Sequence, residues 1–269
     1  MELGDTDLFG SPDQRAMQRR AGHLWTLLGE QPDILCYGRS IGLTGDRPDS
    51  IDRQIALARV QGVAPAECVP PDQVEARIAA LRSAGLNIDL YNRWAGGDEA
   101  VTACRHHLAQ ASLPPDLTVV EMDKTSPPET FARLDAFATE SGVLLPLGPF
   151  LKGEAVPAVC LMAVDQQGAV VCCTSAIGAY HPTSPMGHTF FWGMLATDPA
   201  RRGQGIAKTL GAMSLLAMVD RHGLTIARTG IRPGNVESEK LCTKLGLRQA
   251  EVIVTAIDPT VYASDRITK

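Results

Sequence analysis

The chain has 269 residues, of which 45% are hydrophobic and 20% are charged, a composition that excludes disordered, collagen-like and coiled-coil proteins. Its formal net charge is −5, from 25 Lys and Arg against 30 Asp and Glu. Because nucleic-acid binding shows as a clustered basic excess, we expect no nucleic-acid partner.

The negative charge is concentrated in the first part of the chain. Residues 1–116 hold 16 acidic residues and 11 basic residues, all Arg, whereas residues 117–269 hold 14 of each. A Pro-Pro-Asp segment ends at Asp116, where this composition changes. We therefore predict two modules, residues 1–112 and residues 117–262.

Localisation signals and metal motifs are absent from the sequence pattern. The first ten residues are acidic and lack a basic segment followed by an apolar run, and no apolar run is long enough for a membrane span. The seven cysteines are scattered, with no Cys-x-x-Cys and no His at zinc-like spacing. We expect free thiols, a reducing cytoplasm, no membrane partner and no metal.

The first module is predicted to be mostly helical with a few short strands. Apolar residues recur at helical spacing over 14–29, and a helix following Asp72 can end at Gly85. Alternation over 86–91 then predicts a strand. The helix–Gly–Leu–strand order of residues 73–91 recurs at residues 238–254. This similarity indicates either a decayed internal repeat or the ordinary preference for Gly at helix ends.

The second module alternates strands and helices. Ser126 and Glu129 have the spacing of a capping box, with Pro at the first helical position, and predict a helix that runs to Glu140. The other predicted elements are strands over 117–122, 157–164, 169–177, 189–197 and 225–229, helices over 205–221 and from Asn235, and a last strand ending at Ile257.

The most informative segment runs from Thr197 to Lys208, where a strand, a Gly-bearing loop and a helix start follow one another. Glycines let the backbone turn tightly, and the free N–H groups of a first helical turn favour an anion. The segment is therefore a candidate diphosphate cradle. The spacing fails for a dinucleotide-binding G-x-G-x-x-G, which needs Gly in place of Lys208, and for a P-loop, which needs Gly in place of Arg202 and Ala207.

The pattern Arg202-x-x-Gly205-x-Ala207 instead resembles the pyrophosphate loop of the GNAT family of acyl-CoA-dependent N-acyltransferases. The segment from Asn235 through Ser238, Leu241 and Cys242 to Leu245-Gly246-Leu247 is similar to that family's next helix and its ending. The resemblance covers about residues 117–262. It implies an α/β (α+β) fold with a mixed, mostly antiparallel central sheet flanked by helices, preceded by a mostly helical or degenerate GNAT-like module.

The resemblance also implies that acetyl-CoA, or another acyl-coenzyme A, is the bound cofactor. It places the pantetheine arm along one strand end, the pyrophosphate at the loop and a further contact on the facing helix. Arg201 is a further candidate partner for the outer phosphates, whose oxygens suit an Arg fork. The cofactor-binding residues implied are Leu195, Ala196, Thr197, Arg202, Gly203, Gln204, Gly205, Ile206, Ala207, Lys208 and Asn235.

The catalytic groups depart from the family pattern. Where many relatives carry a Tyr that protonates the leaving thiolate, this chain carries Cys242, whose thiol is the candidate acid. Residues 166–197 contain no Asp or Glu, so His188 is the candidate base, with Glu154 and Glu251 as alternatives. Core packing and a surface location are the competing interpretations for Cys242 and His188 respectively.

The implied activity is acyl transfer, with acetyl as the favoured group, to a primary amine of a small molecule or amino acid, by direct attack in a ternary complex. An aromatic run over 190–192 and apolar residues Leu144, Leu145, Leu147 and Phe150 predict an apolar wall for the acceptor. The alternative is a non-catalytic acyl-CoA sensor or scaffold, favoured by the missing Tyr and the missing strand carboxylate. Residues 1–112 could cover the acceptor site or support a homodimer.

Overall fold

The computed structural model describes residues 1–44 and 47–268, and its strands form one continuous ten-stranded sheet in these residues. The strand order is β1-β2-β3-β10-β4-β9-β8-β7-β6-β5, and neighbours are antiparallel except for the pairs β2–β3 and β8–β9. The mixed, mostly antiparallel sheet of the sequence prediction is thereby confirmed. The strands are β1 (Ile34–Cys36), β2 (Ile41–Thr44), β3 (Val63–Glu67), β4 (Asn87–Gly96), β5 (Thr118–Met122), β6 (Ala158–Val164), β7 (Val170–Ile177), β8 (Thr189–Thr197), β9 (Ile226–Ile231) and β10 (Arg248–Ile257).

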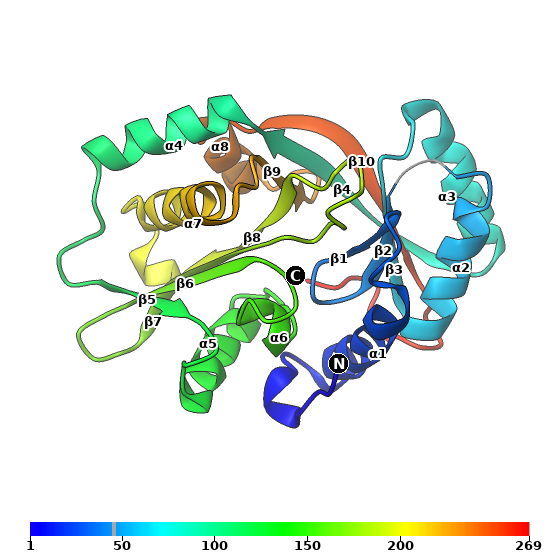
Figure 1. Cartoon of the computed structure of the whole chain (residues 1–269), viewed down its shortest axis with the longest axis horizontal. Helices are drawn as coiled ribbons and strands as arrows, with labels where there is room; N and C mark the ends of the chain where they lie inside the picture. The colour runs from blue at the N-terminus through cyan, green and yellow to red at the C-terminus, as the bar shows by residue number, and fades with distance from the viewer. Residues whose placement is uncertain (45–46, 269) are drawn as a thin grey trace.

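Helices cover the sheet on its two sides (Figure 1). In the second half of the chain, α7 packs on β6, β7 and β8 with α4 beside it, while α5 and α6 pack on the opposite side of the sheet. In the first half, α2 and α3 pack on β3, β4 and β10. The α-helices are α1 (Pro12–Leu28), α2 (Ser50–Gln61), α3 (Val74–Ser83), α4 (Asp98–Gln110), α5 (Pro128–Glu140), α6 (Gly148–Leu151), α7 (Ile206–His222) and α8 (Val236–Lys244).

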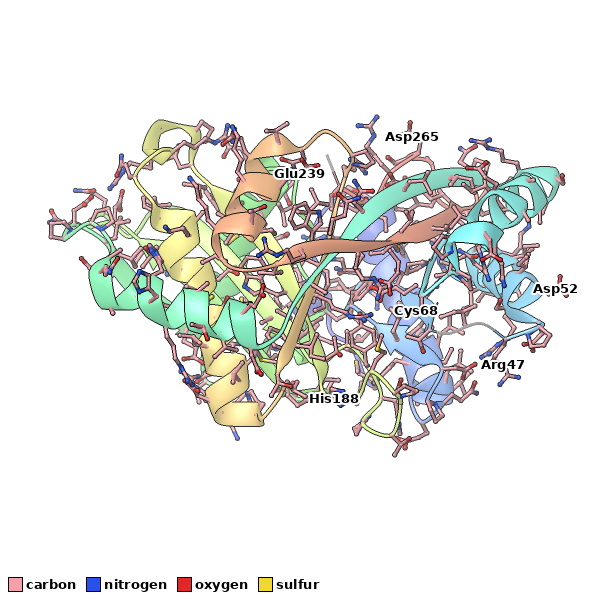
Figure 2. All side chains as sticks on the ribbon, turned by 90° about the horizontal axis from the view of Figure 1, so that it is seen from above. Arg47, Asp52, Cys68, His188, Glu239 and Asp265 are labelled. Carbon is pink, nitrogen blue, oxygen red and sulfur yellow. The ribbon has the colours of Figure 1, made fainter. Side chains whose placement is uncertain are left out.

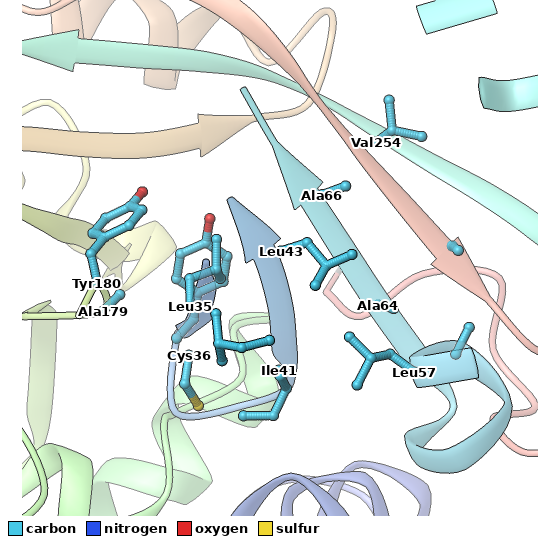
Figure 3. Close-up of a cluster of buried hydrophobic side chains, with 14 of the residues drawn as sticks. Leu35, Cys36, Ile41, Leu43, Leu57, Ala64, Ala66, Ala179, Tyr180 and Val254 are labelled. Carbon is cyan, nitrogen blue, oxygen red and sulfur yellow. The ribbon is translucent and has the colours of Figure 1, made fainter. Parts of the chain in front are cut away.

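Two large apolar clusters lie under these helices. Leu57 of α2 belongs to one cluster with Ala64 and Ala66 of β3, Val254 of β10 and Leu35 of β1 (Figure 3). Phe190 of β8 belongs to the second cluster, under α7. Each buried leucine or phenylalanine side chain contributes about 1.5–3 kcal/mol from apolar burial, so these clusters fix the helices on the sheet.

Most predicted elements of the second module occur within one or two residues of their predicted bounds. The capping box at Ser126 is wrong, because Ser126 instead contacts Asp123, and α5 begins after Pro127 without a side-chain cap. Pro128 does occupy the first turn. The segment predicted as a loop after Gly142 contains the short helix α6.

The sheet runs without interruption across the predicted module boundary. The boundary falls between α4 and β5, but β10 lies between β3 and β4, and β4 pairs with β9. The two segments with the repeated helix–Gly–Leu–strand order therefore lie together, because their strands, β4 and β10, are antiparallel neighbours. Gly85 and Gly246 end the preceding helices with similar positive φ values of 76° and 77°.

A buried ionic cluster joins the two halves on one side of this sheet. Glu67 at the end of β3 lies 2.7 Å from Arg93 of β4 and accepts a hydrogen bond of 2.8 Å from the Tyr180 hydroxyl. Arg228 of β9 lies 3.8 Å from the same carboxylate. Burial raises the pKa of Glu67, while Arg93 acts against that rise. The cluster fixes β3, β4, β9 and the segment after β7 relative to one another.

Candidate active site

The candidate site is a cleft of about 830 Å³ that opens where β8 and β9 diverge. These parallel strands pair from Thr189 with Ile226 to Phe191 with Arg228, and beyond that point each lines one wall of the cleft. A Cβ on Gly193 would lie 3.5 Å from Thr229 Oγ1, so the two walls are still close at this level. The β8 backbone beyond Phe191 has no pairing with β9 and is available to a ligand.

A β-bulge shapes the β8 wall. The pairing of β7 with β8 shifts register between Cys173 and Ser175, and Met194 at the bulge has a φ of 53°. The Cys173 thiol donates to the Met194 carbonyl oxygen at 3.3 Å from the buried side. Bulges re-aim backbone groups next to functional sites, and here the bulge lies directly on the cleft wall.

The glycine loop closes one end of the cleft. Asp198 accepts a hydrogen bond from Ala200 N at 2.9 Å, and the chain then turns through Gly203 and Gly205, with φ of 80° and 78°. No atom lies within 4 Å of the position of a Cβ at either glycine. The first turn of α7 follows and borders the cleft, so its unpaired N–H groups form an anion cradle.

The structure brings nearly all predicted cofactor-binding residues to this cleft. Gln204 is the exception, because it does not line the cleft and its side chain accepts a hydrogen bond from Arg201 Nε at 3.2 Å. The side chain of Asn235 accepts from Ser238 N at 3.3 Å and so caps α8 while also lining the cleft. The predicted residues that line it are Leu195, Ala196, Thr197, Arg202, Gly203, Gly205, Ile206, Ala207, Lys208 and Asn235.

Basic side chains surround the loop end of the cleft. Arg201 is bound to Asp116 at 3.0 Å and is therefore compensated, whereas Arg202 and Lys208 have no ion pair with any described residue. On α8, Lys240 pairs with Glu237 at 2.9 Å. Glu237 is the only carboxylate among the described residues that line the cleft. This end therefore carries uncompensated positive charge suited to phosphate groups.

Cys242 lines the cleft from α8 but is almost completely buried. Burial raises the pKa of its thiol to about 12. At neutral pH the thiol is protonated, but such a weak acid is a poor proton donor to a departing thiolate, whose ordinary pKa is about 8.5. Cys242 therefore lies at the cleft, but the raised pKa of its thiol argues against a role as the proton donor.

None of the three candidate bases lines the cleft. His188 is exposed at the start of β8, before the strands diverge, and its carbonyl accepts a hydrogen bond from Thr225 N at 2.9 Å (Figure 2). Glu154 is exposed near the end of α6. Glu251 lies 3.4 Å from Arg93 Nε, on the ionic cluster. The structure thus separates all three from the place where β8 and β9 part.

The predicted apolar wall is largely wrong. Leu144, Leu145, Leu147 and Phe150 are buried in the protein core and do not line the cleft, which Ser141, Gly142 and Val143 border instead. The side chains of the aromatic run over 190–192 point alternately to the two faces of the sheet, as in any strand. Phe190 is buried under α7 and Trp192 donates from Nε1 to the Gly211 carbonyl at 3.1 Å, whereas the Phe191 side chain lines the cleft at the end away from the glycine loop.

Residues from the first module, which the sequence left unassigned, form the other end of the cleft. Tyr37 packs on Phe191 with ring centroids 4.6 Å apart, and Arg39 Cζ lies 5.6 Å from the same ring centroid. Gly38, between them, has a φ of 68° and permits the tight turn that presents both side chains. That glycine is the one local signal that sequence analysis could have used.

Tyr91 of β4 lies at the floor of the cleft beside Gly230, and its hydroxyl donates to Asp89 Oδ2 at 2.8 Å. Arg232 binds Asp89 through Nε at 3.2 Å and Nη2 at 2.7 Å. Burial raises the pKa of Tyr91 to about 12. This Tyr91–Asp89–Arg232 group supplies an ionisable pair beside the cleft, further along β9 than its last pairing with β8 at Arg228.

The described residues contain no group of three His, Cys, Asp or Glu that could hold a metal ion. All seven cysteines are unpaired, which confirms the prediction of free thiols. No helix in the described part of the chain is both long and apolar enough to cross a bilayer.

Solved structures of acetyltransferases share this fold. A GCN5-related N-acetyltransferase from Kribbella flavida matches with a TM-score of 0.54 at 14% identity, over 91% of this chain and 95% of the other. A GCN5-related N-acetyltransferase-like protein from Streptococcus suis matches with a TM-score of 0.53 at 16% identity, over 84% and 83%. A tandem GNAT protein from the clavulanic acid biosynthesis pathway matches with a TM-score of 0.52 at 14% identity, over 81% and 74%. No family model and no curated protein sequence matches the chain.

Proposed function

Because the chain has the fold of the GCN5-related N-acetyltransferases, we propose that it transfers an acetyl group from acetyl-CoA to a primary amine of a small molecule or amino acid. The observation that carries this proposal is the glycine loop that follows β8. β8 and β9 are parallel strands that diverge, and the loop places the first turn of α7 at the cleft between them. A cytoplasmic location suits its seven unpaired thiols.

The residues fit a diphosphate-bearing thioester. The N–H groups of Ile206, Ala207 and Lys208 would hold the pyrophosphate, and Arg202 would meet the outer phosphates. The unpaired β8 backbone at Leu195 to Thr197 would hydrogen-bond the amide-bearing arm. When bound, acetyl-CoA supplies the acetyl thioester that the amine attacks.

The bulge in β8 supplies the electrostatic part of the mechanism. Met194 and Leu195 line the cleft at the bulge, where their backbone N–H groups would stabilise the negative charge that develops on the acetyl oxygen. Because these donors are backbone groups fixed by the sheet, they need no particular side chain. This explains how activity could persist without the Tyr that many relatives carry at the position of Cys242.

Tyr91 and Asp89 form the proposed proton relay. The attacking ammonium must lose a proton, and the Tyr91 hydroxyl can accept it while passing its own proton to Asp89, 2.8 Å away. The proton on Asp89 is then returned to solvent. Arg232 holds the Asp89 carboxylate in place through two hydrogen bonds.

The second candidate function is a non-catalytic acyl-CoA sensor or scaffold on the same fold. Two observations favour it: the buried, weakly acidic Cys242, and the absence of an unpaired carboxylate from the cleft lining of the described residues. A sensor would bind acetyl-CoA without releasing its thiol to any amine.

Two measurements, made one after the other, test both functions. Isothermal titration with acetyl-CoA should show saturable binding, and a thiol-release assay with a pooled amine library should then show amine-dependent turnover. Binding without turnover would favour the sensor. If acetyl-CoA does not bind, both functions are excluded.

A further inference from the structure

We propose that the acceptor amine carries a carboxylate, bound by Arg39 at the end of the cleft opposite the glycine loop, and that its amine and carboxylate are separated by only a few bonds. The proposal rests on the proposed acetyltransferase function and names its substrate class. The first module would then provide the specificity of the enzyme.

Arg39 is an uncompensated cation facing the cleft. No carboxylate of the described residues lies within 4.0 Å of its guanidinium, and its Nε is buried without a hydrogen-bond partner. Its guanidinium lies over the Phe191 ring, with Cζ 5.6 Å from the ring centroid. Burial lowers the pKa of Arg39 to about 10, so the group is still charged at neutral pH. A partly buried charge without an anionic partner is costly to the folded protein, and a bound anion would reduce that cost.

The neighbouring cations do not share this property. Arg232 is neutralised by Asp89 at 2.7 Å, and Arg93 is neutralised by Glu67 at 2.7 Å. Arg39 is therefore the one cation at the acceptor end, among the described residues that line the cleft, without an ion pair. The buried hydroxyl of Tyr37 beside it also lacks a hydrogen-bond partner and can donate to an anion.

The amount and position of charge favour a carboxylate over a phosphate. One uncompensated guanidinium and one hydroxyl match the single charge of a carboxylate, whose two oxygens suit the planar donor fork of Arg. A phosphomonoester carries a charge of about −1.5 to −2 near neutral pH and would leave an excess negative charge. This end of the cleft therefore fits a monoanion best.

Phe191 sets the distance from this carboxylate to the reacting amine. The ring tip of Phe191 would lie 3.0 Å from a Cβ on Gly193, next to the bulge at Met194, and Arg39 lies over the same ring. One phenyl ring thus separates the guanidinium from the β8 backbone where the thioester would react. An α-amino acid, or one with its amine a few bonds further away, spans that gap.

The test uses the full chain, acetyl-CoA, the twenty proteinogenic L-amino acids with β-alanine and 4-aminobutyrate, and their matched amides. Thiol release measures kcat/KM, and isothermal titration against the CoA-loaded protein measures acceptor binding independently of turnover. We expect at least one amino acid to exceed its amide at least tenfold in kcat/KM, because a hydrogen-bonded ion pair is worth that much. Arg39→Met should remove this preference, and Arg39→Lys should restore part of it.

Arg47→Met is the matched control, because Arg47 is exposed on the surface and pairs there with Asp49. It should keep the preference, and all three variants should bind acetyl-CoA as the parent does. Equal use of acids and amides, a preference that survives Arg39→Met, or binding of no carboxylate in the panel would each overturn the inference. Binding of amino acids that needs Arg39, with no turnover, would support the inference and contradict the acetyltransferase function.

Discussion

The two ends of the cleft are built in different ways. The loop end comes from two short segments, the run from β8 into α7 and the start of α8, and its key groups are backbone N–H donors. The acceptor end combines Tyr37 and Arg39 from the β1–β2 turn, Tyr91 from β4 and Phe191 from β8. A site made of local backbone geometry leaves a readable pattern in the sequence, whereas a site made by long-range strand pairing does not.

This difference indicates that the loop end is hard to change by substitution, whereas the opposite end can change its specificity. Changing the loop end requires new backbone geometry at Gly203 and Gly205. Changing the acceptor end requires only another side chain at Arg39 or Tyr37, each held by surrounding structure. The variants below test this contrast, beginning with the largest expected effect.

Arg93→Met should destabilise the chain by about 3 to 5 kcal/mol, because it leaves Glu67 charged and buried without its partner at 2.7 Å. Equilibrium unfolding in urea measures the change. Arg105→Met is the control, since Arg105 and Asp220 form an exposed pair at 3.0 Å that should contribute at most about 1 kcal/mol. Equal destabilisation by the two variants would show that the buried pair contributes no more to stability than an exposed one.

Gly205→Val should weaken acetyl-CoA binding at least about 100-fold, through left-handed strain and a side chain placed in the anion cradle. Isothermal titration gives the affinity. Gly223→Val carries the same strain, with a φ of 67° and open space at the Cβ, but lies at the end of α7 away from the cleft. This variant should lose stability and keep its affinity for acetyl-CoA. Similar losses of affinity in both variants would contradict the anion cradle at Gly205.

Tyr91→Phe should lower kcat about 100-fold, because it removes the relay to Asp89. His188→Ala should change kcat less than about twofold, since His188 is exposed and outside the cleft. Steady-state kinetics on the two variants decides between these residues. The raised pKa of Tyr91, about 12, keeps its hydroxyl protonated, so a pH profile should show no tyrosine ionisation up to about pH 11.

Cys242→Ala should have the smallest effect, changing kcat less than about threefold, because burial makes this thiol too weak an acid to be needed. Cys104→Ala is the matched control, as Cys104 is equally buried, has a pKa raised to about 12 and lies outside the cleft. Both variants should lose similar stability from a small cavity. A large loss of kcat confined to Cys242→Ala would restore the thiol as the acid.

The sequence predicted the second half of the fold well, because its signals are local. The predicted strand over 189–197 has the same bounds as β8, and the helix predicted from Asn235 begins there because the Asn235 side chain caps α8. The position of β10 between β3 and β4 could not be predicted. It depends on pairing between residues more than 150 positions apart, which no local pattern records.

The same reasoning explains the candidate site. The loop from Arg202 to Lys208 was predicted because the spacing of its glycines reflects a single local backbone conformation. His188 was the candidate base because residues 166–197 contain no Asp or Glu, but the sequence could not show that β8 and β9 are still paired next to it, at Thr189. Arg39 and Tyr91 were missed because each becomes a cleft residue only after strands from both halves join one sheet.

The placement of β10 has a consequence for how the protein is synthesised. Until residues 248–257 leave the ribosome, the nascent chain holds β3 and β4 without the strand that separates them, and each presents an unpaired edge. Domains generally fold as units from the N-terminus during translation, but here the first module cannot complete its sheet early. Final folding therefore waits until β10 has been synthesised, and a translation arrest shortly before β10 should yield an aggregation-prone intermediate that depends on chaperones.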